Sequence, residues 1–340
     1  MKKSLFMLGV AVAALTSCTQ SEVLDIAEGN AIKFGNAFVG KPTRGVTAPE
    51  LTTANIDKMY VFANNGAEVF NNKEVYKITG TNEWGYDNLV KWEDSKTYQF
   101  VAYAGKKFEG ADGTVTANSG NKSLKFENIT VNGTKQFDLL YSQNVERNSA
   151  NNKSKIDFTF EHLLSMVKFT LKSGFGATTT VEVTNFKFYG LKTTETYDAS
   201  ASSPAWTATS TANTSDDTDF IYAGPETAQY KAEGSIDVVN SWVIIPQQNV
   251  GSGTVEMVSF NVTVKDGENT IVDDKTIKAK IPSITWTKGN RYNYIFTITP
   301  EVVEIEDQYI TFNAPTVNAW TDNNLNVDQD TSSTEGVELQ

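Results

Sequence analysis

Strand-like runs of apolar and polar residues recur along this chain from Ile56 onward, with turn residues between them. In residues 258–264 every second residue is Val or Phe, and the residues between them are Ser, Asn and Thr. A period of two is typical of a strand with one buried face, and turn sequences such as Lys265-Asp266-Gly267 separate the runs. No segment has a sustained helical period. The pattern predicts an all-β chain with strands at 58–63, 74–78, 89–92, 98–104, 123–126, 137–141, 181–189, 235–245, 255–264, 271–281 and 292–298.

The run from residue 156 to residue 172 changes its phase. Apolar residues first hold even positions, as in Phe158 and Phe160, and then odd positions, as in Val167 and Phe169. Because strand side chains alternate strictly between two faces, the change predicts a bulge or a bend. His162 shares its phase with Phe158 and Phe160, so we expect a packed, hydrogen-bonded histidine rather than a member of a catalytic triad.

Two domains are expected from the length of the chain. The polar stretch 144–155 is linker-like, which predicts one domain at 45–155 and another at 156–300. Residues 192–219 are rich in Ser, Thr and Ala and are expected to form an exposed loop. Residues 301–340 contain no Lys or Arg; they are expected to hold a strand segment, followed by a flexible acidic tail.

Residues 1–18 have the form of a bacterial lipoprotein signal. Two lysines precede a short apolar run, which ends in Leu15-Thr16-Ser17-Cys18. The run is too short for a spanning helix, which needs about 20 residues. Cys18 is the only cysteine, so its thiol is expected to carry the lipid and to hold the protein on the outer membrane. The alternative is an ordinary signal peptide with a chance cysteine.

The net charge and the cysteine content exclude some binding partners and one source of stability. The formal net charge of −12 becomes −14 after residues 1–18 leave, because only Lys2 and Lys3 are charged there. An acidic chain argues against nucleic acid and against electrostatic binding to anionic lipid. The remaining 322 residues contain no cysteine, so buried cores rather than disulfides must stabilise them.

Candidate chemistry is sparse. The single histidine excludes paired-histidine metal sites, and no glycine-rich loop opens a helix to bind phosphate. Asp216, Asp217 and Asp219 could hold calcium, but a solvated acidic turn is favoured. Trp206, within the polar stretch 192–219, is the best candidate for an exposed sugar-stacking ring. We therefore expect no enzyme activity, no metal and no cofactor.

The second half resembles the fimbrillin family of Bacteroidetes, which comprises lipoprotein-derived pilins and pilin-like surface proteins. Four pieces carry the resemblance in order, behind the lipobox and Thr43-Arg44. They are Phe158-Thr-Phe-Glu-His162-Leu-Leu-Ser-Met166-Val167-Lys-Phe169, Ile245-Pro246-Gln247, Ile284-Thr-Trp286-Thr-Lys-Gly289-Asn-Arg-Tyr292-Asn-Tyr294, and Ile310-Thr-Phe312 with Val317-Asn-Ala-Trp320.

The resemblance implies two tandem transthyretin-like β-sandwich domains. It also implies a fimbrial subunit whose N-terminal arm, residues 19–44, serves as a strand until an arginine-specific protease removes it. A strand from a neighbouring subunit then fills the groove, and subunits join head to tail. The expected partners are other fimbrial subunits, the outer membrane through lipidated Cys18, and a ligand on a host or bacterial surface.

Applied to this chain, the resemblance implies roles for specific residues. Arg44 and Gly45 are the candidate cleavage site, although Arg44 could be merely an exposed basic residue. Arg147, in the predicted linker, is a competing site, and Arg291 lies in a predicted strand. The arm offers Ile32, Phe34 and Phe38 as apolar anchors. The candidate donor-strand anchors, which could instead complete their own domain, are Tyr309, Ile310, Phe312, Val317 and Trp320.

A second function stays open from the sequence. The chain could be a lipid-anchored adhesin or glycan-binding β-sandwich protein that never polymerises, with Trp206 in the ligand site.

Overall fold

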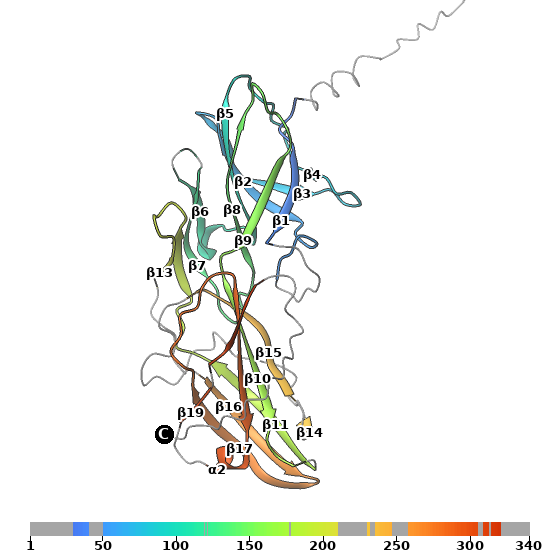
Figure 1. Cartoon of the computed structure of the whole chain (residues 1–340), viewed down its shortest axis with the longest axis vertical. Coiled ribbons are helices and arrows are strands. Elements are labelled where there is room, and N and C mark those ends of the chain that lie inside the picture. Colours follow the sequence, from blue (N-terminus) through green and yellow to red (C-terminus); the bar gives the residue numbers. More distant parts are fainter. Residues whose placement is uncertain are drawn as a thin grey trace, which may run out of the picture.

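The structure is a computed structural model that describes residues 30–40, 50–118, 120, 122–176, 178–209, 230–231, 235–246, 258–304, 309–312 and 314–320. Within these ranges the chain forms four β-sheets, one 3-10 turn, η1 (Gly110–Asp112), and one short helix, α2 (Pro300–Glu304). The predicted all-β class is confirmed. Figure 1 shows an elongated molecule, with the strands of the N-terminal half above those of the C-terminal half.

The first sheet has seven strands. Its order is β1 (Phe34–Val39), β9 (Ile156–His162), β8 (Leu139–Asn148), β5 (Thr97–Gly105), β2 (Lys58–Asn64), β3 (Glu68–Lys77) and β4 (Trp84–Gly85). Neighbours are antiparallel except for β1 and β9, which are parallel. β2 and β5 are buried on both faces, so the alternation expected of a half-exposed strand is replaced there by nearly continuous apolar residues.

The first sheet curls until its two ends meet. β1 contacts β4, and an isolated bridge joins Ala31 to Lys91. The concave face encloses a core to which β1 contributes Phe34, Ala37 and Val39. The convex face carries a second core, which a second sheet covers. β1, the first strand of the described residues, therefore closes the curl.

The covering sheet draws on both halves of the chain. Its order is β13 (Trp206–Ala208), β12 (Thr194–Asp198), β7 (Leu124–Thr130) and β6 (Thr114–Ala117). The expectation that residues 192–219 form only an exposed loop is wrong for this part, since β12 pairs with β7 and buries Tyr197 against the first sheet. The polar composition concealed two short strands because their outer faces are solvated.

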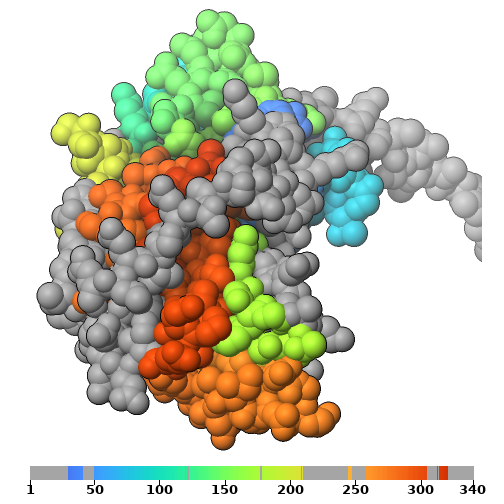
Figure 2. All heavy atoms as spheres, turned by 60° about the horizontal axis from the view of Figure 1, so that its bottom comes forward, coloured from blue at the N-terminus to red at the C-terminus, as the bar shows by residue number. Residues whose placement is uncertain are grey.

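The C-terminal half is built from two further sheets around one core. One has the order β15 (Ser235–Ile244), β10 (Ser165–Ser173), β18 (Asn290–Ile298) and β20 (Thr316–Ala319). The other has the order β14 (Tyr230–Lys231), β11 (Thr179–Phe188), β16 (Val258–Asp266), β17 (Asn269–Lys280) and β19 (Tyr309–Thr311). Figure 2 shows this end of the molecule, with the hairpin of β16 and β17 beside the ends of β10 and β18.

The phase change between residues 156 and 172 marks a crossing between sheets. β9 alternates buried and exposed residues up to His162 and pairs in the first sheet, whereas β10 begins at Ser165 in another sheet. The predicted boundary at 155/156 therefore precedes a strand that hydrogen-bonds with the N-terminal half. The predicted linker 144–155 is likewise strand up to Asn148. The division into two tandem transthyretin-like domains stays a prediction.

Candidate functional site

The N-terminal arm lies in a slot between β9, a strand of the first sheet, and residues 90–92, which follow β4. On one side β1 runs parallel to β9, and the Ile156 amide donates to the Lys33 carbonyl at 2.9 Å. On the other side the Ile32 amide donates to the Val90 carbonyl at 2.8 Å, and the Trp92 amide donates to the Asn30 carbonyl at 3.0 Å. Residues 30–40 thus satisfy backbone groups on both edges of the slot, as an added strand does.

Phe34 anchors the arm in the concave core. Its side chain is 2% exposed, and its ring centroid lies 5.6 Å from that of Tyr86 and 6.1 Å from that of Phe158. Phe70 and Phe100 complete the cage at 6.0 and 6.5 Å. Ile32 is fully buried beside it. Complete burial of such side chains contributes about 1.5–3 kcal/mol each, so two side chains hold the arm firmly.

The predicted anchor Phe38 faces solvent instead. The register between β1 and β9 shifts between Phe34 and Ala37, and the Asn36 amide donates to the Asp157 carboxylate at 2.6 Å. The shift turns Ala37 and Val39 inward and leaves Phe38 40% exposed. The expectation that Phe38 is an apolar anchor is therefore wrong, because a one-residue slip exchanges the faces of a strand.

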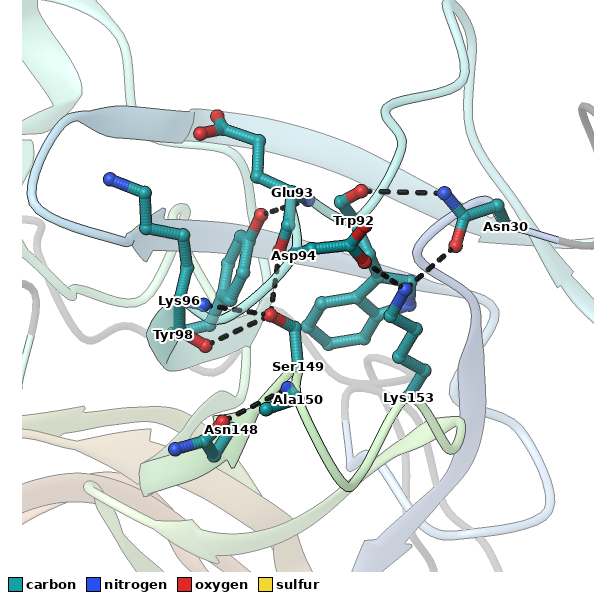
Figure 3. Close-up of polar contacts among 10 residues, drawn as sticks. All are labelled: Asn30, Trp92, Glu93, Asp94, Lys96, Tyr98, Asn148, Ser149, Ala150 and Lys153. Atoms are coloured by element: carbon teal, nitrogen blue, oxygen red, sulfur yellow. Dashed lines mark hydrogen bonds and ion pairs between the residues drawn. The ribbon is translucent and has the colours of Figure 1, made fainter.

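A polar cluster ties down the first described residue of the arm (Figure 3). The ammonium group of Lys153 contacts the Asn30 side-chain oxygen at 3.2 Å and the Asp94 carboxylate at 2.6 Å. Nearby, Ser149 donates to the Glu93 carbonyl at 2.6 Å and so joins the loop that follows β8 to the loop that precedes β5. The two Lys153 contacts are exposed, so each contributes little, up to about 1 kcal/mol, whereas Ser149 is buried.

A second site lies where the two halves of the chain meet. Glu50, which is 2% exposed, accepts hydrogen bonds from the Arg291 guanidinium and, at 2.8 Å, from the Trp320 indole. The Trp320 ring stacks on His162 with centroids 4.2 Å apart. His162 Nδ1 in turn lies 3.1 Å from an Asp138 carboxylate oxygen. We call Glu50, Asp138, His162, Arg291 and Trp320 the junction cluster.

Burial decides the electrostatics of the junction cluster. Loss of water raises the pKa of Glu50, and the nearby Arg291 charge opposes this shift without cancelling it. One Glu50 oxygen, Oε2, and the Nε atom of Arg291 have no hydrogen-bond partner among the described residues. The cluster is therefore only partly satisfied, which makes it sensitive to the loss of any one member.

Histidine 162 is a structural residue, as predicted. It is buried at the end of β9, between the Asp138 carboxylate and the Trp320 ring. Among the described residues no group of three His, Cys, Asp or Glu side chains could hold a metal ion. Asp216, Asp217 and Asp219, the calcium candidates, lie outside the described residues.

The C-terminal segment docks on its own chain. β19 pairs with β17 and places the backbone of Tyr309 and Ile310 at a sheet edge. Phe312 is buried in the C-terminal core, 5.2 Å from the Phe296 ring. β20 pairs with β18, but Val317 is 47% exposed. Among the candidate donor anchors whose side chains are described, Phe312 and Trp320 are held inside and Val317 is not.

The three arginines occupy different settings. Arg147 lies on β8, opposite Tyr98 on β5, so its expected place in a linker is wrong. Arg291 lies at the start of β18, as its strand-like surroundings predicted, and pairs with Glu50. Arg44 and Gly45, together with the lipid-attachment residue Cys18, lie outside the described residues.

Trp206 is a packing residue. Its indole N–H donates to the Leu163 carbonyl at 2.8 Å, and its ring lies 5.3 Å from that of Tyr197. The half-buried side chain joins β13 to the chain that crosses between sheets. The ring is half-buried rather than fully exposed, and the glycan-stacking site stays a prediction.

Sequence reasoning missed most of the junction cluster. Glu50 and Arg291 are separated by 241 positions, and no local pattern connects them. One signal was available. Glu50 follows the arm that the resemblance implies is removed, and Trp320 lies in the segment that it implies is donated to a neighbour. Nothing in the sequence paired them.

Fold and site together define an all-β protein whose N-terminal strand fills a sheet edge and whose C-terminal strand docks at the junction of its two halves. The profile of the Fimbrillin-like family matches residues 43–320, and the chain belongs to that family. Fimbrillin-like proteins are structural proteins of the cell surface rather than enzymes, and membership of this family gives the chain the same general character. No curated protein matches the sequence significantly.

Several solved structures resemble the chain. A candidate cell adhesion protein from Bacteroides uniformis is 17% identical, with a TM-score of 0.49 over 86% of this chain and 100% of that one. A candidate cell adhesion protein from Bacteroides ovatus is 17% identical, with a TM-score of 0.48 over 85% and 97%. A fimbrial assembly protein from Parabacteroides distasonis is 11% identical, with a TM-score of 0.39 over 85% and 99%. The family assignment depends on the profile match alone.

No helix in the described part of the chain is long and apolar enough to cross a membrane.

Proposed function

We propose that this chain is a structural subunit of a surface fimbria. It is exported as a lipoprotein through Cys18 and is assembled by strand exchange after its N-terminal arm is removed. The observation that carries the proposal is the seating of residues 30–40, which close the first sheet through backbone pairing and through Phe34. An element that is both an edge strand and a core component leaves a groove when it departs.

Removal of the arm would create two needs at once. The backbone edge of β9 would lose its partner, and the rings of Phe158, Tyr86 and Phe70, which now surround Phe34, would face water. An extended segment from another subunit supplies both backbone hydrogen bonds and an apolar side chain. Head-to-tail joining of this kind does not close on itself and produces a filament.

The arginines favour cleavage at Arg44. A protease needs an accessible, extended chain, whereas Arg147 and Arg291 both lie in hydrogen-bonded strands. Cleavage between Arg44 and Gly45 would separate residues 30–40 from the rest of the chain. The new N-terminus would precede the described segment that starts at Glu50.

The donor would be the C-terminal segment 309–320. Its pairing with its own chain is short, because β19 has three residues and β20 has four. Phe312 and Trp320 are large apolar side chains that could fill an equivalent slot in a neighbour. Release of this segment exposes both rings to water. Burial of the rings in the vacant groove of a neighbouring subunit must therefore compensate for the lost free energy.

The experiment that tests the proposal is treatment of the purified mature chain with an arginine-specific protease. We expect loss of the arm followed by a ladder of oligomers on a gel. Arg44→Ala should abolish the ladder, and Arg147→Ala, the matched control, should retain it. Trimming at Gly45 without any oligomer would refute polymerisation, and a ladder from Arg44→Ala would refute the cleavage site. The N-terminal residue of protein recovered from cells distinguishes an anchored form, which starts at Cys18, from a processed one.

A further inference from the structure

The junction cluster binds the segment that follows the arm to the segment that ends the C-terminal sheet. Glu50 is the first described residue after the candidate cleavage site, and Trp320 is the last described residue of the chain. One carboxylate oxygen of Glu50 contacts both Trp320 and Arg291, and Arg291 is one of the four β18 residues that pair with β20. The start of the segment that follows the candidate cleavage site and the last described residue of the chain thus share one buried carboxylate.

A short turn connects this charge to the arm itself. The Val39 amide, on β1, donates to the Thr53 hydroxyl at 2.9 Å. The Asn55 side chain closes the same turn by donating to the Glu50 carbonyl at 2.9 Å, and the Leu51 amide donates to the Asp138 carboxylate at 2.9 Å. We call residues 50–55 the coupling turn. Contacts run without interruption from β1 through this turn to Trp320.

We propose that the coupling turn is a latch, which makes the docking of the C-terminal segment depend on the docking of the N-terminal arm. While β1 is seated, Thr53 is held and Glu50 is positioned to hold Trp320. When β1 leaves, the turn loses its contact with Val39 and the hold on Trp320 weakens. The inference deepens the proposed function, because it links removal of the arm to release of the donor segment.

The structure favours such a latch on two grounds. β20 is hydrogen-bonded along one side over four residues, and Val317 in it is exposed, so β20 is anchored by the buried residues that flank it, Pro315 and Trp320. The cluster that holds the Trp320 ring is buried and only partly satisfied. A buried charge whose partner is lost is costly, so a small displacement of Glu50 has a large effect on Trp320.

Coupling of this kind must be reciprocal. If the seated arm strengthens the docking of Trp320, then a docked Trp320 strengthens the arm by the same factor. This requirement separates a latch from a local contact, which affects only its own neighbourhood.

The test is hydrogen–deuterium exchange of the full chain, followed by mass spectrometry. Glu50→Gln should speed exchange in residues 316–320 at least tenfold. Its matched control is Glu161→Gln, because Glu161 also pairs across the two halves, with Lys288 at 3.1 Å, but is exposed and does not contact Trp320. The arm is perturbed by Phe34→Ala, with Phe38→Ala as the control on the same strand. Phe34→Ala should speed exchange in residues 316–320 about threefold, and both controls should change it less than twofold.

Reciprocity is tested with Trp320→Phe, which keeps a ring but loses the N–H that Glu50 accepts. It should speed exchange in residues 34–39 about threefold. The latch is refuted if Phe34→Ala loosens residues 34–39 and leaves 316–320 unchanged. It is also refuted if Glu50→Gln speeds exchange equally in β16, because Glu50 would then only stabilise the whole fold. The result is independent of oligomer formation, so failure of the latch and failure of the proposed assembly are distinguishable.

Discussion

Truncation of Phe34 is the perturbation that most directly tests how the arm is held. Its ring is 2% exposed and contacts four aromatic rings. Phe→Ala changes in well-packed cores cost about 3–5 kcal/mol. Phe38 lies four residues away on the same strand and is 40% exposed, so Phe38→Ala should cost about 0.5 kcal/mol or less. Both variants make the same Phe→Ala change on the same strand, so a difference between their stabilities reports the burial of the side chain.

The Ile156 amide reports on the seating of the arm, because it donates to the Lys33 carbonyl at 2.9 Å. If the arm opens locally, exchange at this amide follows the free energy of opening. A loss of about 3 kcal/mol corresponds to roughly a 150-fold faster exchange for Phe34→Ala. Phe38→Ala should stay within about twofold of the parent chain. Equal acceleration by both variants would refute the reasoning, since it would mean that the cage around Phe34 does not hold the arm.

Three further predictions concern other parts of the fold. Burial raises the pKa of Glu195 to about 7. Between about pH 4.5 and 7 the folded chain therefore keeps a proton on Glu195 that the unfolded chain has released. The free energy of unfolding consequently falls as the pH rises through that window. Glu195→Gln should thus be more stable relative to the parent at pH 8 than at pH 5, by about 3 kcal/mol; equal differences in thermal midpoint at the two pH values would contradict this. Gly105→Ala should lower the thermal midpoint of unfolding far more than Gly66→Ala. Both glycines have positive φ, but of the two only Gly105 would place its added Cβ against a backbone oxygen, that of Asp138 at 2.1 Å. Similar losses in the two variants would argue against the clash. Trp206→Phe should cost about 1 kcal/mol, because it leaves the Leu163 carbonyl without its donor; a lost glycan-array signal at unchanged stability would assign Trp206 to binding instead.

Local pattern was sufficient for most of the secondary structure. Alternation identified the strands around residues 258–264 and 292–298, because a half-buried strand repeats its side chains every two residues. It also located the break after His162. It could not say that this break carries the chain from one sheet to another, since a bulge and a crossing have the same phase signature. The strands near Trp206 escaped notice because their outer residues are polar.

The junction cluster depended on three-dimensional contact. Glu50 and Trp320 are 270 positions apart, and neither lies in a motif that specifies a partner. The exposure of Phe38 likewise followed from a register shift against β9, which depends on how Asp157 meets the Asn36 amide.

The sequence by itself determined the all-β class, the packed role of His162 and the family, because these depend on residue periodicity and on ordered motifs. Only the tertiary structure decided which strands share a sheet, which face of the arm is buried and which distant residues meet at the junction. The physical reason is that periodicity reports the environment of each residue along one strand. Strand pairing and buried charge contacts depend instead on segments that the folded backbone brings together from far apart in the chain.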